Sequence, residues 1–410
     1  MKKFSMLFLA AAVALVGAIV APSKAEAIPA FARQVGVPCY ACHYQHIPKL
    51  NAFGREFKLG GFTKSAQDLI QDDHFSMPPV MNAAFIMKYG FQQASPKGGG
   101  ADKGVWTLPS DASIYVGGRV AENLGALVEV GVTGAAGLKN SKLIYSKDFG
   151  GVRGGVSIYG TDGAGPGYSM EFFNTNSIGT HASIEDAAWS SATLQGGWKN
   201  AAQGLSFFAG SPLFFANVGL WGPAQGGAVN PDTGFDLSMY YRLAITPKIG
   251  DGLDLMVGIQ GSSGKTKVAN GGESAGACTT ACQGQPDLEL KTDSMRFDAQ
   301  LQTELSGGMS LEVVAAYATA KSDSVFAGTP NDKKTMSLGA TLGLMKGAGL
   351  DLGYGNIDTG AAANGTYTAM VIGAYYDVAQ NVSVKLWYQA YSGDAKPGDN
   401  DIHLQAIIGF

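Results

Sequence analysis

The feature that most restricts the fold of this chain is a strict alternation of apolar and polar residues. In the segment 296–305, apolar residues and one Thr occupy the odd positions, and charged or amide residues occupy the even ones. The segments 253–260 and 382–389 alternate in the same way. A period of two is that of a β-strand, because successive side chains point to opposite faces of a sheet. The pattern therefore predicts strands that each have one apolar and one polar face.

Composition narrows the kind of β protein. The chain has 410 residues, of which 46% are hydrophobic and only 15% are charged, yet after the N-terminus no apolar run is long enough for a membrane-spanning helix. This leaves two possibilities: a large buried core, or a membrane β-barrel whose apolar residues alternate along its strands. The net charge of −4 gives no support to nucleic-acid binding, which usually requires a basic stripe.

Turn signals fall into two length classes, as expected for a barrel with short periplasmic turns and longer outer loops. Short signals lie at 123–125, 306–308, 347–349 and 379–381, and long Gly- and Asp-rich connections lie at 93–105, 161–183, 212–234, 263–291 and 321–333. Counting the alternating segments predicts an all-β fold, an antiparallel outer-membrane β-barrel of about 16 strands over residues 80–410. The last segment alternates up to a terminal Phe410, which resembles the signal read by the outer-membrane insertion machinery. A soluble β-sandwich is the alternative.

The N-terminus has the pattern of a secretory signal peptide. Two lysines follow Met1, an almost unbroken apolar run covers 4–21, and Ala25-Glu26-Ala27 is a small-x-small cleavage site. We therefore expect residues 1–27 to be removed on export, with a membrane anchor as the alternative. Export places the chain in an oxidising compartment, where spare thiols form disulfides.

Cys39 and Cys42 are three residues apart and are followed at once by His43. This spacing predicts one covalent haem c, because each thiol can add to one haem vinyl group and the imidazole can bind the iron from below. A thioredoxin-like dithiol or half of a zinc site are the alternatives, but neither has its usual companions nearby. The remaining Cys278 and Cys282 lie in a predicted outer loop, where we expect a local disulfide.

Residues 28–79 form the predicted haem domain. They are too few for a conventional core, so the haem and the barrel wall must supply much of the packing. Within this domain, 50–58 has its apolar residues on one helical face, which could press on the porphyrin. Arg33 and Arg55, with Lys58, are candidates to neutralise the haem propionates.

The sixth iron ligand must come from the opposite side of the porphyrin. His46 is three residues after His43, so in a helix both would point the same way, and we expect His46 either to support the iron ligands from behind or to lie at the surface. Met77 is the favoured distal ligand because Met77-Pro78-Pro79 resembles the Met-Pro segment of many soluble c-type cytochromes. His74 and an open position remain alternatives. A thioether ligand would raise the reduction potential.

The segments 28–38 and 50–62, on either side of the Cys-x-x-Cys-His motif, resemble the N-terminus of the fused outer-membrane cytochrome-porins of iron-oxidising bacteria. Their Phe-Ala-Arg-Gln-x-Gly and Phe-Gly-Arg-x-Phe-Lys runs carry the resemblance, and His46 departs from it. The resemblance implies a single haem domain that precedes and plugs a barrel in the same chain. It also implies that extracellular Fe(II) gives an electron to the haem, which passes it to periplasmic c-type cytochromes.

These patterns predict an outer-membrane electron-transfer protein whose haem domain lies in the barrel lumen or at its periplasmic side. No acid, base and nucleophile constellation is visible, so we expect electron transfer without bond-making on a substrate; as an enzyme it would be an Fe(II):cytochrome c oxidoreductase. Expected partners are membrane lipid, an extracellular donor or acceptor such as Fe(II), and periplasmic carriers. Two other functions stay open, a diffusion porin with an N-terminal plug and a haem enzyme acting on a small oxidant.

Overall fold

The computed structural model describes residues 30–47, 49–73, 75–79, 82–95, 104–133, 137–172, 201–222, 236–250, 252–268, 288–322, 329–379 and 381–410. The predicted signal peptide, His74 and the predicted disulfide between Cys278 and Cys282 lie outside these residues. Within them, no helix has both the length and the apolarity needed to cross a bilayer.

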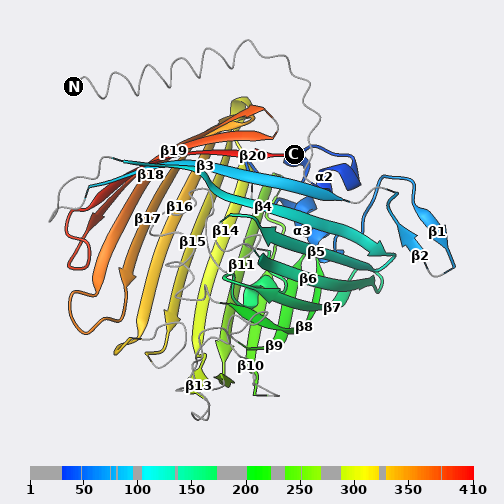
Figure 1. The fold of residues 1–410 in the computed structure, drawn as a ribbon, viewed down its shortest axis with the longest axis horizontal. Coiled ribbons are helices and arrows are strands. Elements are labelled where there is room, and N and C mark those ends of the chain that lie inside the picture. Colours follow the sequence, from blue (N-terminus) through cyan, green and yellow to red (C-terminus); the bar gives the residue numbers. More distant parts are fainter. Residues whose placement is uncertain are drawn as a thin grey trace.

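Sixteen strands of the described residues close into one antiparallel barrel, shown in Figure 1. They are β3 (Ala83–Ser95), β4 (Val105–Ala121), β5 (Leu124–Gly131), β6 (Gly137–Asp148), β7 (Arg153–Thr161), β8 (Ala202–Ser211), β9 (Phe214–Gly222), β10 (Ser238–Ile245), β11 (Leu253–Ser263), β14 (Ser294–Glu304), β15 (Ser310–Ala320), β16 (Lys333–Met345), β17 (Ala348–Asp358), β18 (Thr366–Ala379), β19 (Val382–Ser392) and β20 (Asn400–Gly409). The barrel closes where β20 pairs with β3, with Leu404 opposite Phe91. The predicted fold class and strand number are confirmed.

The period-two pattern places polar side chains inside the barrel and apolar ones outside. On β14, Arg296 and Asp298 are buried in the interior, whereas Phe297 between them is 47% exposed on the outer face. Other outward apolar residues on other strands behave in the same way, among them Leu243, Leu338, Leu352 and Ile372. An apolar outer wall around a polar interior is the arrangement of a barrel that faces lipid.

Short turns collect at one end of the barrel, which we call the short-turn end. They join β4 to β5, β14 to β15, β16 to β17 and β18 to β19, where the sequence predicted short turns. The long connection predicted at 212–234 is wrong in its first half. Only Pro212 and Leu213 separate β8 from β9, and β9 then runs to Gly222. The connection predicted at 263–291 contains a two-stranded hairpin of β12 (Lys265–Val268) and β13 (Leu288–Lys291).

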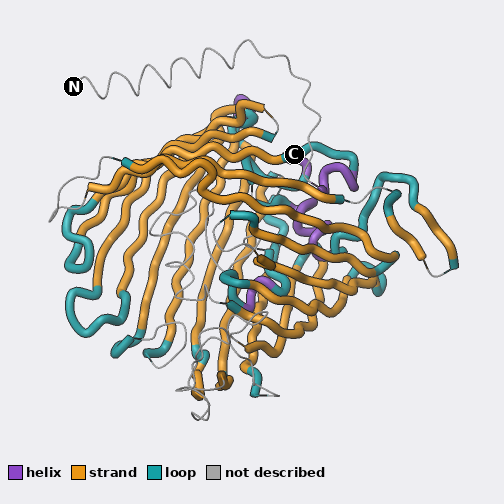
Figure 2. The backbone as a smooth tube through the Cα atoms, in the orientation of Figure 1, coloured by secondary structure: helices purple, strands orange, loops and turns teal. Residues whose placement is uncertain are grey.

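The N-terminal residues fold into short elements at the short-turn end. These are α2 (Ala30–Val35), the 3₁₀ turn η1 (Cys39–Ala41), α3 (Ala52–Leu59) and a hairpin of β1 (Ile70–Asp72) and β2 (Phe75–Met77). We call the described residues of 30–64 the N-terminal insert. Figures 1 and 2 show its helices against the barrel wall, with the β1–β2 hairpin projecting from the rim. The predicted helix over 50–58 is confirmed as α3, whose N-cap Asn51 accepts a hydrogen bond from the Gly54 amide at 2.9 Å.

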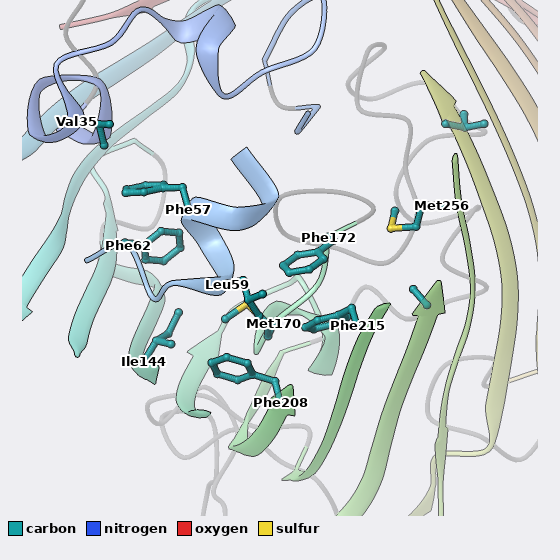
Figure 3. Close-up of a cluster of buried hydrophobic side chains, with 12 residues drawn as sticks. Val35, Phe57, Leu59, Phe62, Ile144, Met170, Phe172, Phe208, Phe215 and Met256 are labelled. Atoms are coloured by element: carbon teal, nitrogen blue, oxygen red, sulfur yellow. The ribbon is translucent and has the colours of Figure 1, made fainter. Parts of the chain in front are cut away.

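An apolar cluster joins the N-terminal insert to the barrel, as Figure 3 shows. The insert contributes Val35, Phe57, Leu59 and Phe62, and the wall contributes side chains that include Ile144, Phe208, Phe215 and Met256. Phe31 adds a stacked contact to the Phe62 ring, with centroids 4.6 Å apart. The insert therefore shares one core with the barrel, as its small size required.

Candidate functional site

One tight turn brings together the two thiols and the imidazole of the Cys-x-x-Cys-His motif. The carbonyl of Cys39 accepts hydrogen bonds from the amides of Cys42 at 3.1 Å and His43 at 2.9 Å. Both cysteines carry thiols rather than forming a disulfide, and both are partly buried. Burial raises the pKa of the Cys42 thiol, and the neighbouring Cys39 adds to this effect.

His43 is oriented by a main-chain hydrogen bond. Its Nδ1 lies 3.1 Å from the carbonyl oxygen of Lys49. A carbonyl only accepts, so Nδ1 carries the proton and Nε2 is the nitrogen with the lone pair. The chain doubles back here, since His43 also pairs with Leu50 in an isolated β-bridge. A histidine whose Nδ1–H is held by a carbonyl is typical of metal-binding imidazoles, because that bond fixes the ring and its tautomer.

Helix α3 packs directly on this turn. The amide of Asn51 donates to the Cys42 carbonyl at 3.0 Å, and the Asn51 side chain donates to the Ala41 carbonyl at 3.0 Å. A Cβ at Gly54 would overlap the Cys42 carbonyl oxygen. The Gly in the Phe-Gly-Arg run is therefore needed for close approach, and not for an unusual backbone angle.

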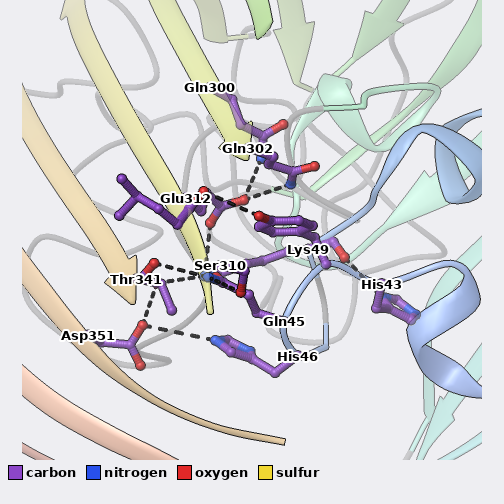
Figure 4. Close-up of polar contacts among 12 residues, drawn as sticks. His43, Gln45, His46, Lys49, Gln300, Gln302, Ser310, Glu312, Thr341 and Asp351 are labelled. Carbon is purple, nitrogen blue, oxygen red and sulfur yellow. Dashed lines mark hydrogen bonds and ion pairs between the residues drawn. The ribbon is translucent and has the colours of Figure 1, made fainter. Parts of the chain in front are cut away.

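The loop after His43 is fixed to the inner wall of the barrel by a buried polar network, shown in Figure 4. The Lys49 ammonium forms an ion pair with Glu312 of β15 at 2.8 Å and donates to Thr341 of β16 at 2.6 Å. Glu312 also accepts hydrogen bonds from Gln300 at 3.0 Å and Gln302 at 2.8 Å. Every charge in this network has a partner, as burial requires.

His46 points to the wall and is 3% exposed, so of the two roles expected for it the surface role is wrong. Its ring lies 4.4 Å from that of Tyr375, and its Nε2 lies 4.0 Å from the Asp351 carboxylate. Burial lowers the pKa of His46 to about 4, and the nearby Lys49 and Lys385 ammonium groups lower it further than Asp351 raises it. The helical geometry assumed in the prediction is absent, because the chain turns back after His43.

The two arginines predicted to hold propionates contact the barrel wall. Arg33 donates to the Ala83 carbonyl at the start of β3. Arg55 donates to the Leu50 carbonyl at 3.3 Å and forms an ion pair with Asp254 of β11. Both guanidinium groups therefore already have acceptors in this structure, and binding a propionate would mean sharing or exchanging them.

The structure does not bring the favoured distal ligand to His43. Met77 lies in β2, pairs with Ile70 and is 37% exposed on the projecting hairpin. His74 lies outside the described residues. Within the described part of the chain, no group of three or more His, Cys, Asp or Glu side chains could hold a metal ion. The zinc alternative thus lacks a second pair of ligands in that part.

Sequence reasoning missed the residues of the wall network, above all Lys49 and Glu312. Nothing near Lys49 in the sequence marks it, since its partners are on strands far along the chain. The role of Gly54 could have been found, because a Gly inside a helical pattern usually has a packing reason.

Comparison with known proteins supports the fold alone. No family model matches the chain, and no curated protein matches it. Among solved structures, the outer membrane channel DcaP of Acinetobacter baumannii has a TM-score of 0.51 at 12% identity, covering 80% of this chain and 97% of that one. An anion-selective porin from Comamonas acidovorans has a TM-score of 0.48 at 12% identity, covering 81% and 99%. OmpT, an outer membrane protein of Vibrio cholerae, has a TM-score of 0.46 at 12% identity, covering 84% and 100%.

Proposed function

We propose that this chain is an outer-membrane electron-transfer protein that carries one haem c on Cys39 and Cys42 at the short-turn end of its barrel. The observation that carries the proposal is the motif turn itself. It presents two thiols and an imidazole whose Nδ1 is held by the Lys49 carbonyl. These are the donor set and the ligand orientation that covalent haem requires.

The outer-membrane location rests on the barrel. Its closed sheet leaves no unpaired strand edge, and its outer face is apolar, which are the two conditions for spanning lipid with strands. The fold likeness to the DcaP channel agrees with this location. The predicted signal peptide supplies the export route.

Different residues of the chain would each have a separate role in holding the haem. Each Cys thiol would add across one vinyl group, so that the sulfur binds one carbon and the thiol proton goes to the other. His43 would bind the iron through Nε2, and α3 would keep the turn rigid through Gly54 and Asn51. Bound there, haem would supply reversible one-electron chemistry of iron. The apolar cluster around Phe57 and Phe62 holds the insert against the barrel wall.

The direction of electron flow follows from the resemblance to cytochrome-porins. An insulating membrane stops electrons unless a redox centre bridges it, and a barrel that carries a haem is a device for this purpose. We propose extracellular Fe(II) as the donor and periplasmic c-type cytochromes as the acceptors.

Haem staining of the denatured protein, together with a reduced-minus-oxidised spectrum, tests the cofactor. The wild-type chain should retain stain after denaturation, and Cys39→Ala with Cys42→Ala should lose it while the barrel still assembles. Stopped-flow mixing with Fe(II) then tests the donor. Covalent haem that stays oxidised when Fe(II) is added at a reducing potential would overturn the iron-oxidation part alone.

The second candidate is a diffusion porin whose N-terminal insert is a plug. It is favoured by the barrel interior, which is lined with polar residues such as Gln260, Gln302 and Asn217. Planar-bilayer conductance separates the two functions. A chain without covalent haem that conducts small ions steadily would support the porin and refute the electron-transfer proposal.

A further inference from the structure

We propose that Lys49 is a positioning residue through which strand β15 of the barrel sets the hydrogen bond of the iron ligand His43, and with it the reduction potential of the haem. This inference rests on the proposed function and extends it from the motif to the barrel wall.

Lys49 contacts the motif through its main chain and the barrel wall through its side chain. Its main-chain carbonyl accepts from His43 Nδ1 at 3.1 Å and from the Tyr44 amide at 2.9 Å. Its side-chain ammonium is held by Glu312 at 2.8 Å and by Thr341 at 2.6 Å. The position of the carbonyl that orients His43 is therefore fixed by side chains of the barrel.

The ion pair between Lys49 and Glu312, which anchors the loop, is buried and is held in one geometry. Lys49 is 5% exposed and Glu312 is 1% exposed, so water does not compete for the ion pair. Gln300 and Gln302 hold the Glu312 carboxylate in place, and Gln302 also donates to the carbonyl of Leu50 at 3.2 Å, next to Lys49 in the chain. A buried, fully hydrogen-bonded ion pair keeps one geometry far better than an exposed one.

The chemical consequence follows from the proton on Nδ1. A strong bond from Nδ1–H to a carbonyl makes the imidazole a more basic ligand, and a more basic ligand stabilises the oxidised iron. A loosened loop would weaken that bond, so the reduction potential should rise. Charge alone could also shift the potential, because removing the ammonium or the carboxylate changes the local field.

A charge-neutral double substitution separates positioning from charge. Lys49→Met with Glu312→Gln removes one positive and one negative group, so only the anchor is lost. We expect the haem-loaded protein to show a higher potential, by roughly a tenfold change in the ratio of reduced to oxidised haem, or about 59 mV for one electron. The proton resonances of the His43 ring should broaden or shift. The single variant Lys49→Arg keeps the cation, so its reduction potential and its His43 ring resonances should stay close to those of the wild type.

The control is another charge-neutral pair deletion, Lys321→Met with Asp332→Asn, which removes an ion pair at the opposite end of the strands from the insert. It should leave the potential unchanged. If the double substitution at Lys49 and Glu312 retains covalent haem with wild-type potential and wild-type His43 resonances, the proposal is wrong. Should that double variant fail to assemble, Thr341→Val removes only one of the two side chains that hold the Lys49 ammonium. If the reduction potential does not rise in Thr341→Val, the proposal is equally wrong. A wild-type chain without covalent haem would instead refute the proposed function.

Discussion

Acidification should loosen the N-terminal insert through His46. The imidazole is buried against Tyr375, and burial is the largest cause that lowers its pKa from 6.5 to about 4. When the insert leaves the wall, His46 regains water and an ordinary pKa. Between pH 6.5 and about pH 4, His46 is therefore protonated in the undocked state but neutral in the docked state. Docking weakens as the pH falls through this range and stops weakening below about pH 4.

The magnitude follows from the same two values. One pKa unit corresponds to about 1.4 kcal/mol, so this group alone should cost the docked state about 3 kcal/mol across the window, or somewhat more than a hundredfold in the docking equilibrium. Above pH 6.5 the group contributes no pH dependence. The variant His46→Gln is needed to assign the wild-type pH dependence to the imidazole.

Hydrogen exchange of the amides in residues 30–64, corrected for the pH dependence of intrinsic exchange, measures this equilibrium in the purified protein. Wild-type protection should fall steeply between about pH 6.5 and pH 4, and His46→Gln should flatten that fall. The matched control is His403→Gln, another buried histidine, which stacks on Trp387 of the wall and lies outside the insert. If His46→Gln keeps the wild-type slope, the argument from His46 burial is refuted.

Two further outcomes are expected. Gly54→Ala should lower the yield of covalent haem at equal amounts of barrel, because its Cβ would overlap the Cys42 carbonyl oxygen and overpacking of this kind costs about 1–3 kcal/mol. Haem staining checks this against the control Gly137→Ala, where nothing lies within 4 Å of the added Cβ. Equal staining of the two variants would contradict the prediction. Met77→Ala should leave the visible spectrum of the reduced protein unchanged, since the structure keeps Met77 on a hairpin away from His43; a shifted spectrum would restore Met77 as the distal ligand.

The barrel could be predicted from the sequence because most strands have chemically distinct faces. Residues 294–304 alternate polar and apolar, and the structure turns those faces inward and outward as expected. The failure at 212–234 has a physical cause. On β9 the inward positions Phe215, Asn217 and Trp221 mix apolar and polar residues, because this part of the wall packs on buried side chains. The polar-inside rule therefore carried no signal there.

Some residues of the candidate site could likewise be predicted from the sequence, and others could not. Cys39, Cys42 and His43 could be recognised because the chemistry lies within one turn, and local spacing is what a sequence records directly. The Lys49 to Glu312 pair joins segments that are far apart in the chain, and it depends on the closure of the barrel and on the depth of the insert. His46 was misplaced for a related reason, since its direction depends on the chain reversal after His43.

The insert meets the barrel with two chemically different sides. Phe57, Leu59 and Phe62 meet apolar residues on the wall, and such contacts are non-directional, so they favour docking without choosing an orientation. The ion pairs of Lys49 with Glu312 and Arg55 with Asp254 are directional and tolerate one orientation. We infer that the apolar side supplies most of the docking free energy, while the two ion pairs fix the rotation of the motif turn inside the barrel. Loss of an ion pair should therefore change the environment of His43 before it releases the insert.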